Sequence, residues 1–331
     1  MSKPLLDVQN LSVRFPVKRG GMFGGKSWLY AVDDISFTVP KGETLAIVGE
    51  SGSGKTTAAL ACARLVSAYQ GKVQLGDHDF LTLKDEALRQ ARARVQIIFQ
   101  DPYASLNPRL RSEAIVREPI DSLETAPPSE RQKIVDDLFK SVGLRPEQQR
   151  LFPHQFSGGQ RQRIGIARAL ATSPDLIICD EPVSALDVAV QAQILNLLRK
   201  LQKDLGLTYL FISHDLGVVQ HMADSIAVMY MGKIVEQADR LSLFNNPLHP
   251  YTSALLSAVP SVDRKRREQQ KRILIPGDPP DPINPPKGCR FANRCPVAKD
   301  MCLNSPPPLR ELKGGHKVAC HLVGDDAKSP L

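Results

Sequence analysis

Gly-Glu-Ser-Gly-Ser-Gly-Lys-Thr-Thr, residues 49–57, is the stretch that decides the fold of this 331-residue chain. A continuous apolar run at 44–48 precedes it, and a helix-forming segment at 57–61 follows. Strand, glycine loop and helix together let consecutive backbone N–H groups surround a phosphate, because glycine permits close approach and the helix N-terminus is partially positive. The stretch therefore predicts a nucleotide-binding loop in which Lys55 reaches the β and γ phosphates and Thr56 ligates Mg²⁺. The loop residues expected to contact the nucleotide are Gly49, Glu50, Ser51, Gly52, Ser53, Gly54, Lys55, Thr56 and Thr57.

Two further apolar runs end in polar side chains that suit phosphate chemistry. Residues 176–179 lead into Asp180 and Glu181, and residues 209–212 are followed closely by His214. We expect Asp180 to be held near the metal and Glu181 to polarise an attacking water. Acidic residues at a strand end also serve as plain helix caps, and the glycine loop upstream favours the catalytic interpretation. By itself, His214 suits either a γ-phosphate contact or a satisfied core histidine.

The same apolar runs indicate buried parallel strands of an α/β sheet, because helical segments at 160–172 and 190–205 separate them. The candidate catalytic residues then lie past the carboxyl ends of the strands, where open α/β sheets bind ligands. Residues 111–151 are rich in charge and helical periodicity and break at the pair Pro127-Pro128. We expect this segment to form a helical lobe inserted into the sheet domain.

Composition narrows the class of protein without naming it. With 331 residues and 42% hydrophobic residues, the chain can form one large domain and a smaller one. No stretch approaches the ~18 continuous apolar residues of a membrane span, and the first residues lack the apolar run of a secretory signal. We therefore expect a cytosolic chain that can still dock on a membrane protein. The net charge of +8 is compatible with nucleic acid, anionic lipid or nucleotide as a partner, and the basic run at 264–267 reads as a solvated helix face or linker.

Six cysteines in a cytosolic chain argue against disulfide bonds. Cys62 and Cys179 lie in apolar stretches and are interpreted as small core residues. The other four lie in a proline-rich tail that is too poor in apolar residues to fold on its own packing. Four thiolates suit either tetrahedral zinc or an iron–sulfur cluster. These four residues are Cys289, Cys295, Cys302 and Cys320.

Taken in order along residues 1–250, the motifs resemble those of ATP-binding-cassette (ABC) ATPases. The motif residues are Gln100, the signature Ser157-Gly158-Gly159-Gln160, Asp180-Glu181, Asp187 and His214. The resemblance implies that His214 senses the γ phosphate and that Gln100 helps to bind Mg²⁺ and reports nucleotide state to a membrane partner. It implies as well that Asp180 holds Mg²⁺ through water, that Asp187 crosses a dimer interface and that the signature faces the partner's ATP. Phe156 replaces the usual leucine and keeps an apolar anchor.

In this family adenine stacks on an aromatic residue in the first strand region. Strand-like segments at 5–15 and 31–39 are joined by a glycine-rich basic stretch at 18–26. Phe15 occupies the family's position and is our choice, with Tyr30 as the alternative. Either residue can also be an ordinary strand packing residue.

Two segments resemble one branch of the family, the dipeptide and oligopeptide importer ATPases. They are 246–260, which begins Asn-Pro-Leu-His-Pro-Tyr-Thr, and 100–109, Gln-Asp-Pro-Tyr-Ala-Ser-Leu-Asn-Pro-Arg. Both are expected to lie outside the phosphate chemistry. The tail resembles a C-terminal extension in which a [4Fe–4S] cluster occurs, so we expect a cluster, with zinc or no metal as the alternatives. Its expected role is a structural staple, so that Cys295→Ser would disorder the tail and weaken assembly but spare nucleotide binding.

The resemblance implies an α/β fold: a RecA-like P-loop core, an N-terminal antiparallel β subdomain and an inserted helical subdomain at about 101–160. We expect an ABC ATPase domain at 1–258 and the cysteine-containing extension at 259–331. The implied function is ATP hydrolysis that drives peptide uptake at the cytoplasmic face of the bacterial inner membrane. The implied partners are a second ATPase subunit, expected to be a different chain, two membrane permeases and a substrate-binding protein, with no nucleic acid.

Two other classes of function stay open on the sequence. One is a soluble ABC ATPase that acts on nucleic acid or ribosomes, although the chain carries one cassette and no internal repeat. The other is a regulatory module that holds nucleotide without turnover, which the intact Glu181 and His214 disfavour. The cargo also stays open among dipeptides, longer peptides, nickel chelates and haem.

Overall fold

The computed structural model describes residues 3–18, 26–259, 273–278 and 280–331. Most of the glycine-rich stretch at 18–26 and all of the basic run at 264–267 lie outside the described residues. The chain divides into two compact units. The first comprises Met1–Asp7, Thr38–Thr44 and Val73–Ile212, and the second comprises Val8–Phe37, Leu45–Lys72 and Ser213–Leu331.

The first unit is built on a parallel sheet in the order β8-β7-β6. These strands are β6 (Val95–Ile98), β7 (Leu176–Asp180) and β8 (Thr208–Ser213). Ile178 pairs with Ile97 on one side and with Leu210 on the other. Every residue of β7 and β8 is buried, so the prediction of buried parallel strands at 176–179 and 209–212 is confirmed. In the same unit, the end of β4 (Gln70–Leu75) pairs with the short β5 (His78–Asp79).

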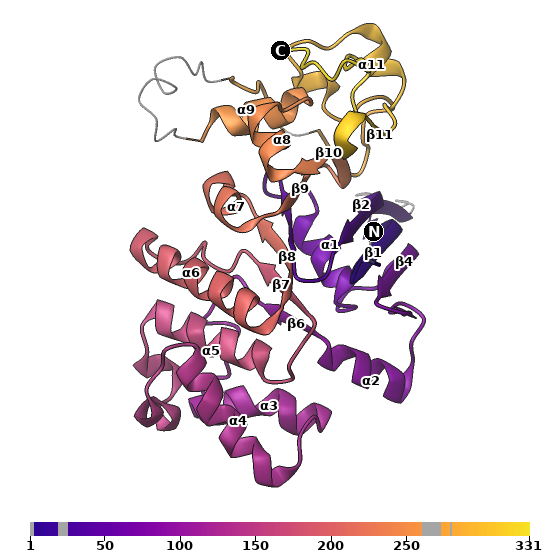
Figure 1. The fold of residues 1–331 in the computed structure, drawn as a ribbon. Helices are drawn as coiled ribbons and strands as arrows, with labels where there is room; N and C mark the ends of the chain where they lie inside the picture. Colours follow the sequence, from indigo (N-terminus) through magenta and orange to yellow (C-terminus); the bar gives the residue numbers. More distant parts are fainter. Residues whose placement is uncertain (1–2, 19–25, 260–272, 279) are drawn as a thin grey trace. The chain divides into compact units, whose positions relative to one another are not determined.

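Helices of the first unit overlap the predicted helical segments, except the first helix, at Asp85–Ala93, which the sequence did not predict. They are α2 (Asp85–Ala93), α3 (Ser112–Leu123), α4 (Pro128–Ser141), α5 (Gly158–Leu170) and α6 (Val188–Leu205), with 3-10 turns at Pro146–Arg150 and Pro153–Gln155. α3, α4 and α5 pack side by side (Figure 1), burying Ile115, Val135 and Phe139. The predicted break falls between α3 and α4, where Pro128 begins the second helix because its missing N–H is not needed there.

The second unit contains the glycine loop and the tail. β3 (Thr44–Val48) pairs in parallel with β9 (Ser225–Tyr230), which pairs antiparallel with β10 (Lys233–Asp239). β1 (Leu6–Lys18) lies between β2 (Lys26–Val39) and β4 in the other sheet. The helices are α1 (Lys55–Cys62), α7 (Leu216–Met222), α8 (Arg240–Asn245) and α9 (Pro250–Ser257). None of the helices that the structure describes combines the length and the hydropathy needed to cross a lipid bilayer.

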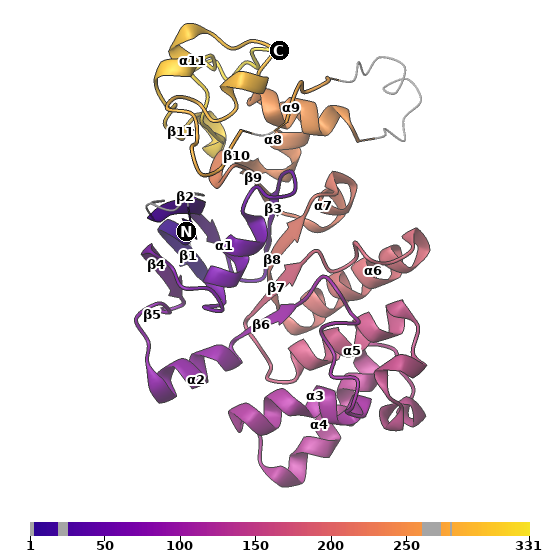
Figure 2. The same cartoon turned by 180° about the vertical axis from the view of Figure 1, so that it is seen from behind.

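The tail adds short elements to the edge of β10, as Figure 2 shows from behind. They are a 3-10 turn at Ala292–Arg294, α11 (Asp300–Asn304), β11 (Arg310–Glu311), a 3-10 turn at Lys313–Gly315 and β12 (Lys317–Val318). β12 pairs antiparallel with β10, so that Val318 lies opposite Glu236. A small apolar cluster of Leu248, Val318, Cys320 and Val323 underlies this edge. Pairing with β10 therefore helps to order the tail.

Glu236 is the buried polar centre of this attachment. Its side chain is fully buried, and its carboxylate accepts hydrogen bonds from the backbone N–H groups of Leu248 (2.7 Å) and His249 (2.9 Å). The ring of His316, from the tail, lies 2.7 Å from the same carboxylate. The Glu236 carboxylate thus binds both the backbone that leads into α9 and a side chain of the tail. These partners compensate for its burial, since a buried charge needs hydrogen bonds.

We expect Glu236→Ala to lower the free energy of unfolding by about 3 kcal/mol, because two buried N–H groups and a buried histidine lose their acceptor. Glu311→Ala is the matched control. Glu311 pairs with Lys317 at 3.6 Å in the same tail, but both side chains are exposed, so its loss should cost ~0.5 kcal/mol or less. Chemical denaturation of the two variants measures the difference. Equal losses would contradict the central role of Glu236.

Candidate active site

The predicted site residues divide between the two units. The second unit carries Phe15, the glycine loop at 49–57 and His214. The first unit carries Gln100, Asp180, Glu181, Asp187 and the signature Ser157-Gly158-Gly159-Gln160.

The glycine loop turns so tightly that side chains are excluded at two of its positions. Gly49 has φ +152° and Gly54 has φ +101°, values that side chains disfavour. A Cβ atom at Gly49 would overlap the carbonyl oxygen of Met229 in β9, and one at Gly54 would overlap the carbonyl oxygen of Ala31 in β2. The loop is therefore pressed against the backbone of neighbouring strands.

Lys55 begins α1 and places its ammonium group at this turn. The side chain is only 5% exposed, and Nζ donates to the carbonyl oxygens of Gly49 (2.8 Å) and Glu50 (2.9 Å). Within the described residues, the buried hydroxyl of Ser53 in the same loop has no hydrogen-bond partner. A buried cation, a buried hydroxyl without a hydrogen-bond partner in the described residues and a helix N-terminus each favour an anionic ligand. The residues present thus fit the phosphates of a nucleotide.

Glu50 connects this loop to the tail, which was not foreseen from the sequence. Its backbone N–H donates to the hydroxyl of Tyr251 (2.8 Å), the first residue after Pro250 in α9. Its carboxylate accepts two hydrogen bonds from Arg294, at 2.8 and 3.3 Å. Tyr251, from the segment 246–260, therefore contacts the backbone of the predicted phosphate loop. No local pattern marks these partners, because they are more than 200 residues from Glu50 in the chain.

In the first unit the structure brings Gln100 and Glu181 together. The Nε2 atom of Gln100 donates to the Glu181 carboxylate at 3.0 Å. Glu181 has a left-handed backbone, with φ 47°, and its N–H donates to the carbonyl oxygen of Ile212 in β8 (3.0 Å). Asp180, one residue earlier, is buried at the end of β7. The turn at Glu181 therefore separates a buried acid from one that faces Gln100.

The signature forms the beginning of α5. Ser157 caps the helix: its Oγ accepts from Gln160 N (3.4 Å), and the Gln160 side chain accepts from Ser157 N (3.0 Å). A Cβ atom at Gly159 would overlap Val190 of α6, so α5 can approach α6 only with glycine there. Phe156 is buried, which agrees with its interpretation as an apolar anchor. Asp187 is exposed just before α6.

The two aromatic candidates for adenine stacking have different surroundings. Phe15 is 39% exposed. Tyr30 accepts a hydrogen bond from Arg14 Nη1 at 3.3 Å, and its ring meets the ring of Tyr69 edge-on at 6.3 Å. Tyr30 is thus engaged with its own neighbours, whereas Phe15 presents ring surface to solvent. His214 is exposed directly after β8.

The four tail cysteines line one small cavity of about 10 Å³. The chain closes on itself here, because Cys289 N donates to Cys302 O at 2.7 Å and a Cβ atom at Gly288 would overlap the same carbonyl group. Burial, with smaller contributions from the other three thiols, raises the pKa of the Cys289 thiol to about 11. As the side chains are placed, no three histidine, cysteine or acidic side chains of the described residues form a group that could hold a metal ion.

Two family models match the chain. One, described as "ABC transporter", matches residues 32–184. The other, described as "Oligopeptide/dipeptide transporter, C-terminal region", matches residues 235–302. The second match includes Glu236, Tyr251 and Arg294, the residues that attach the tail and contact the loop.

Named relatives align over nearly the whole chain. The oligopeptide transport ATP-binding protein AppF of Bacillus subtilis is 49% identical over 320 residues, which are 96% of this chain and 97% of AppF. The dipeptide transport ATP-binding protein DppF of Haemophilus influenzae is 45% identical over 317 residues, which are 96% of each chain.

Solved structures share the fold. The dimeric ATP-binding cassette MJ0796, in a post-hydrolysis state bound to ADP and Pi, matches with a TM-score of 0.62 and 28% identity, over 71% of this chain and 98% of that one. cbiO1 from Clostridium perfringens, part of the ABC transporter complex cbiONQ, matches with a TM-score of 0.63 and 26% identity, over 74% of this chain and 92% of that one.

We expect Gly49→Ala to lower the free energy of unfolding by about 2 kcal/mol or more and to abolish nucleotide binding, because the added methyl group overlaps the Met229 carbonyl. Gly52→Ala is the control. Gly52 also has positive φ, +76°, but no atom lies within 4 Å of its Cβ position, so only backbone strain of about 1 kcal/mol applies. Denaturation without nucleotide separates the two. Equal stability of the variants would show that the Met229 carbonyl yields.

Proposed function

The chain belongs to the ATP-binding subunits of ABC transporters, and from that premise we propose that it powers the uptake of dipeptides or oligopeptides into a bacterium. Membership of the family confirms the predicted ABC-type α/β fold and the ATPase activity. The peptide cargo is supported by the names of the relatives and by the second family model, which covers 235–302. We propose that the subunit works at the cytoplasmic face of the inner membrane, as a peripheral protein.

The observation that carries the proposal is the glycine loop with its buried lysine. The Lys55 ammonium is only 5% exposed, and keeping a charge away from water costs free energy. Binding of a triphosphate would offset that cost. It would also give the Ser53 hydroxyl, which has no partner in the described residues, a hydrogen-bond acceptor. Lys55 would then neutralise charge that develops on the β and γ phosphates.

The first unit supplies the groups for hydrolysis. Glu181 would accept a proton from the attacking water, and its hydrogen bond with Gln100 holds the carboxylate in one orientation. Because Gln100 donates through Nε2, its amide oxygen stays available for a metal. Thr56, Gln100 and, through water, Asp180 would hold Mg²⁺, which neutralises phosphate charge when bound. His214 would contact the γ phosphate, and Phe15 would stack on adenine.

Exposed signature and loop residues support assembly with a second ATPase subunit. Ser157, at the start of the 13-residue helix α5, is exposed, and a helix N-terminus favours phosphate. Asp187 is exposed, and the apolar side chain of Val188 beside it is 81% exposed. We propose that Ser157-Gly158-Gly159-Gln160 completes the partner's ATP site and that Asp187 crosses the interface. The partner is expected to be a different chain, and the complex to include two permeases and a substrate-binding protein.

In the tail we propose that the four cysteines bind a metal centre, a [4Fe–4S] cluster in preference to zinc. Two observations support this proposal. The four cysteines line the same cavity, and the apolar cluster of the tail is small, with four buried members. Since the thiols do not form a metal group as they are placed, binding requires them to converge further. Such a centre would contribute the stability that a small core lacks.

We expect Glu181→Gln to bind ATP as the parent does and to hydrolyse it at least about 100-fold more slowly, because the amide cannot accept the proton of the attacking water. The stalled protein should accumulate as a closed dimer. Asp204→Asn, the same chemical change at an exposed acid of the first unit, is the control and should hydrolyse normally. ATP hydrolysis and dimer mass of the complex purified from membranes, with mass spectrometry of its subunits, test the proposal. Parental hydrolysis by Glu181→Gln would exclude Glu181 as the base, and absence of permease subunits would refute the transporter assembly.

Anaerobic purification followed by iron, zinc and sulfide analysis tests the metal centre. We expect iron and labile sulfide in equal amounts and their loss in Cys295→Ser, with unchanged content in Cys62→Ser, since Cys62 lies in α1. Stoichiometric zinc without sulfide would exclude the cluster, and the absence of both metals would exclude a metal centre.

A further inference from the structure

Glu50 presents an electrostatic problem for a phosphate-binding loop. It is the second residue of the loop, and its carboxylate side chain is 30% exposed. A triphosphate bound to the same loop would bring several negative charges close to this carboxylate. Repulsion between the carboxylate and the phosphates weakens nucleotide binding unless a cation lies between or beside them.

Arg294 supplies that cation from the tail. Its guanidinium forms a two-pronged contact with the Glu50 carboxylate, at 2.8 and 3.3 Å, and its side chain is only 8% exposed. A third hydrogen bond, at 3.3 Å, goes to the hydroxyl of Tyr230 in β9. Paired prongs hold a carboxylate in one orientation, and burial limits screening by salt. The Glu50 charge is therefore both neutralised and fixed.

The same residue is held at its backbone. Tyr251 takes the N–H of Glu50, while the Glu50 carbonyl oxygen accepts from Lys55 Nζ and, at 3.2 Å, from Ser53 N. Fixing Glu50 thus fixes one of the two carbonyl groups that hold the Lys55 ammonium. The tail acts on the phosphate site through Glu50 without being in direct contact with the nucleotide.

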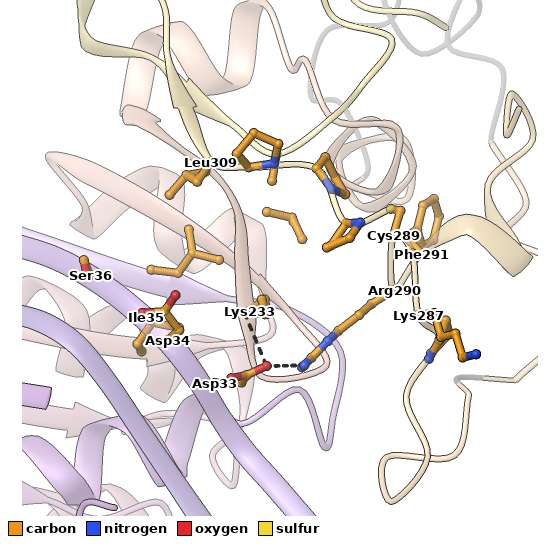
Figure 3. Close-up of a pocket in the computed structure, with 18 residues that line it drawn as sticks. Asp33, Asp34, Ile35, Ser36, Lys233, Lys287, Cys289, Arg290, Phe291 and Leu309 are labelled. Atoms are coloured by element: carbon orange, nitrogen blue, oxygen red, sulfur yellow. Dashed lines mark hydrogen bonds and ion pairs between the residues drawn. The ribbon is translucent and has the colours of Figure 1, made fainter. Parts of the chain in front are cut away.

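Arg294 comes from the segment between Cys289 and Cys295, and that segment is anchored separately by Arg290. Figure 3 shows Arg290 reaching Asp33, which Lys233 also contacts, at the wall of a cavity of about 540 Å³. Arg290 also donates to the Met231 carbonyl. The two arginines lie in one short segment, but only Arg294 contacts the loop in the interactions described here. Arg290 therefore provides a matched comparison.

We propose that Arg294 is a positioning residue for ATP: it neutralises Glu50 and holds the phosphate loop, so that the tail sets the affinity of the site for nucleotide. This inference rests on the proposed nucleotide site. It differs from the expectation, drawn from the sequence, that damage at Cys295 spares nucleotide binding, because Cys295 is the neighbour of Arg294 in the chain.

The test is a set of variants of the full-length chain, with the Kd for MgATP measured by calorimetry. We expect Arg294→Gln to raise the Kd about tenfold, because the bare Glu50 carboxylate then faces the phosphates. Glu50→Gln alone should lower the Kd below that of the parent, because the Arg294 cation then faces the phosphates without its carboxylate partner. The double variant Glu50→Gln, Arg294→Gln should return to within about threefold of the parent, since no unpaired charge is left.

Two further measurements separate this role from simple support of the tail. The defect of Arg294→Gln should shrink at high salt, which screens the exposed side of Glu50. Arg290→Gln removes an equivalent anchor of the same segment and should leave the Kd within about twofold. Additive losses in the double variant, an equal loss in Arg290→Gln or an unchanged Kd in Arg294→Gln would each overturn the inference. Failure of the parent chain to bind MgATP would refute the nucleotide site itself.

Discussion

The close approach of the glycine loop to the carbonyl groups of β2 and β9 is the constraint on which the rest of the second unit depends. Gly49 and Gly54 lie where a methyl group would overlap Met229 or Ala31, so the loop closes onto these strands only with glycine at both positions. That closure brings the loop carbonyls to Lys55 and buries its ammonium. The backbone around the loop thus holds the ammonium in one place before any ligand binds, as a preorganised site does.

The tail is attached to the rest of the second unit by buried polar contacts as well as by the packing of Phe291 against Tyr230 and Tyr251. Glu236, Arg290 and Arg294 each join residues far apart in the chain through charged groups that are largely buried. Such contacts have strict geometry and cost much when one partner is lost. Glu50 is the residue at which the tail meets the glycine loop.

Backbone conformation places the candidate catalytic side chains of the first unit. In the first unit, a buried strand ends at Asp180, and the left-handed turn at Glu181 directs the next carboxylate to Gln100. α5 can lie close to α6 because Gly159 has no side chain. Backbone conformation, rather than side-chain charge, thus decides which acid is buried and which is presented for chemistry.

The sequence by itself determined the strands at 176–179 and 209–212, the helical lobe broken at Pro128, the phosphate loop and the order of motifs that identifies the family. These features follow from local periodicity, from proline and glycine stereochemistry and from short spacings, all of which are written in neighbouring residues. Only the tertiary structure decided that Tyr251 and Arg294 contact Glu50 and that Glu236 holds the tail. A hydrogen bond or ion pair between residues so distant in the chain depends on where the fold carries each side chain, and no local pattern of residues encodes that.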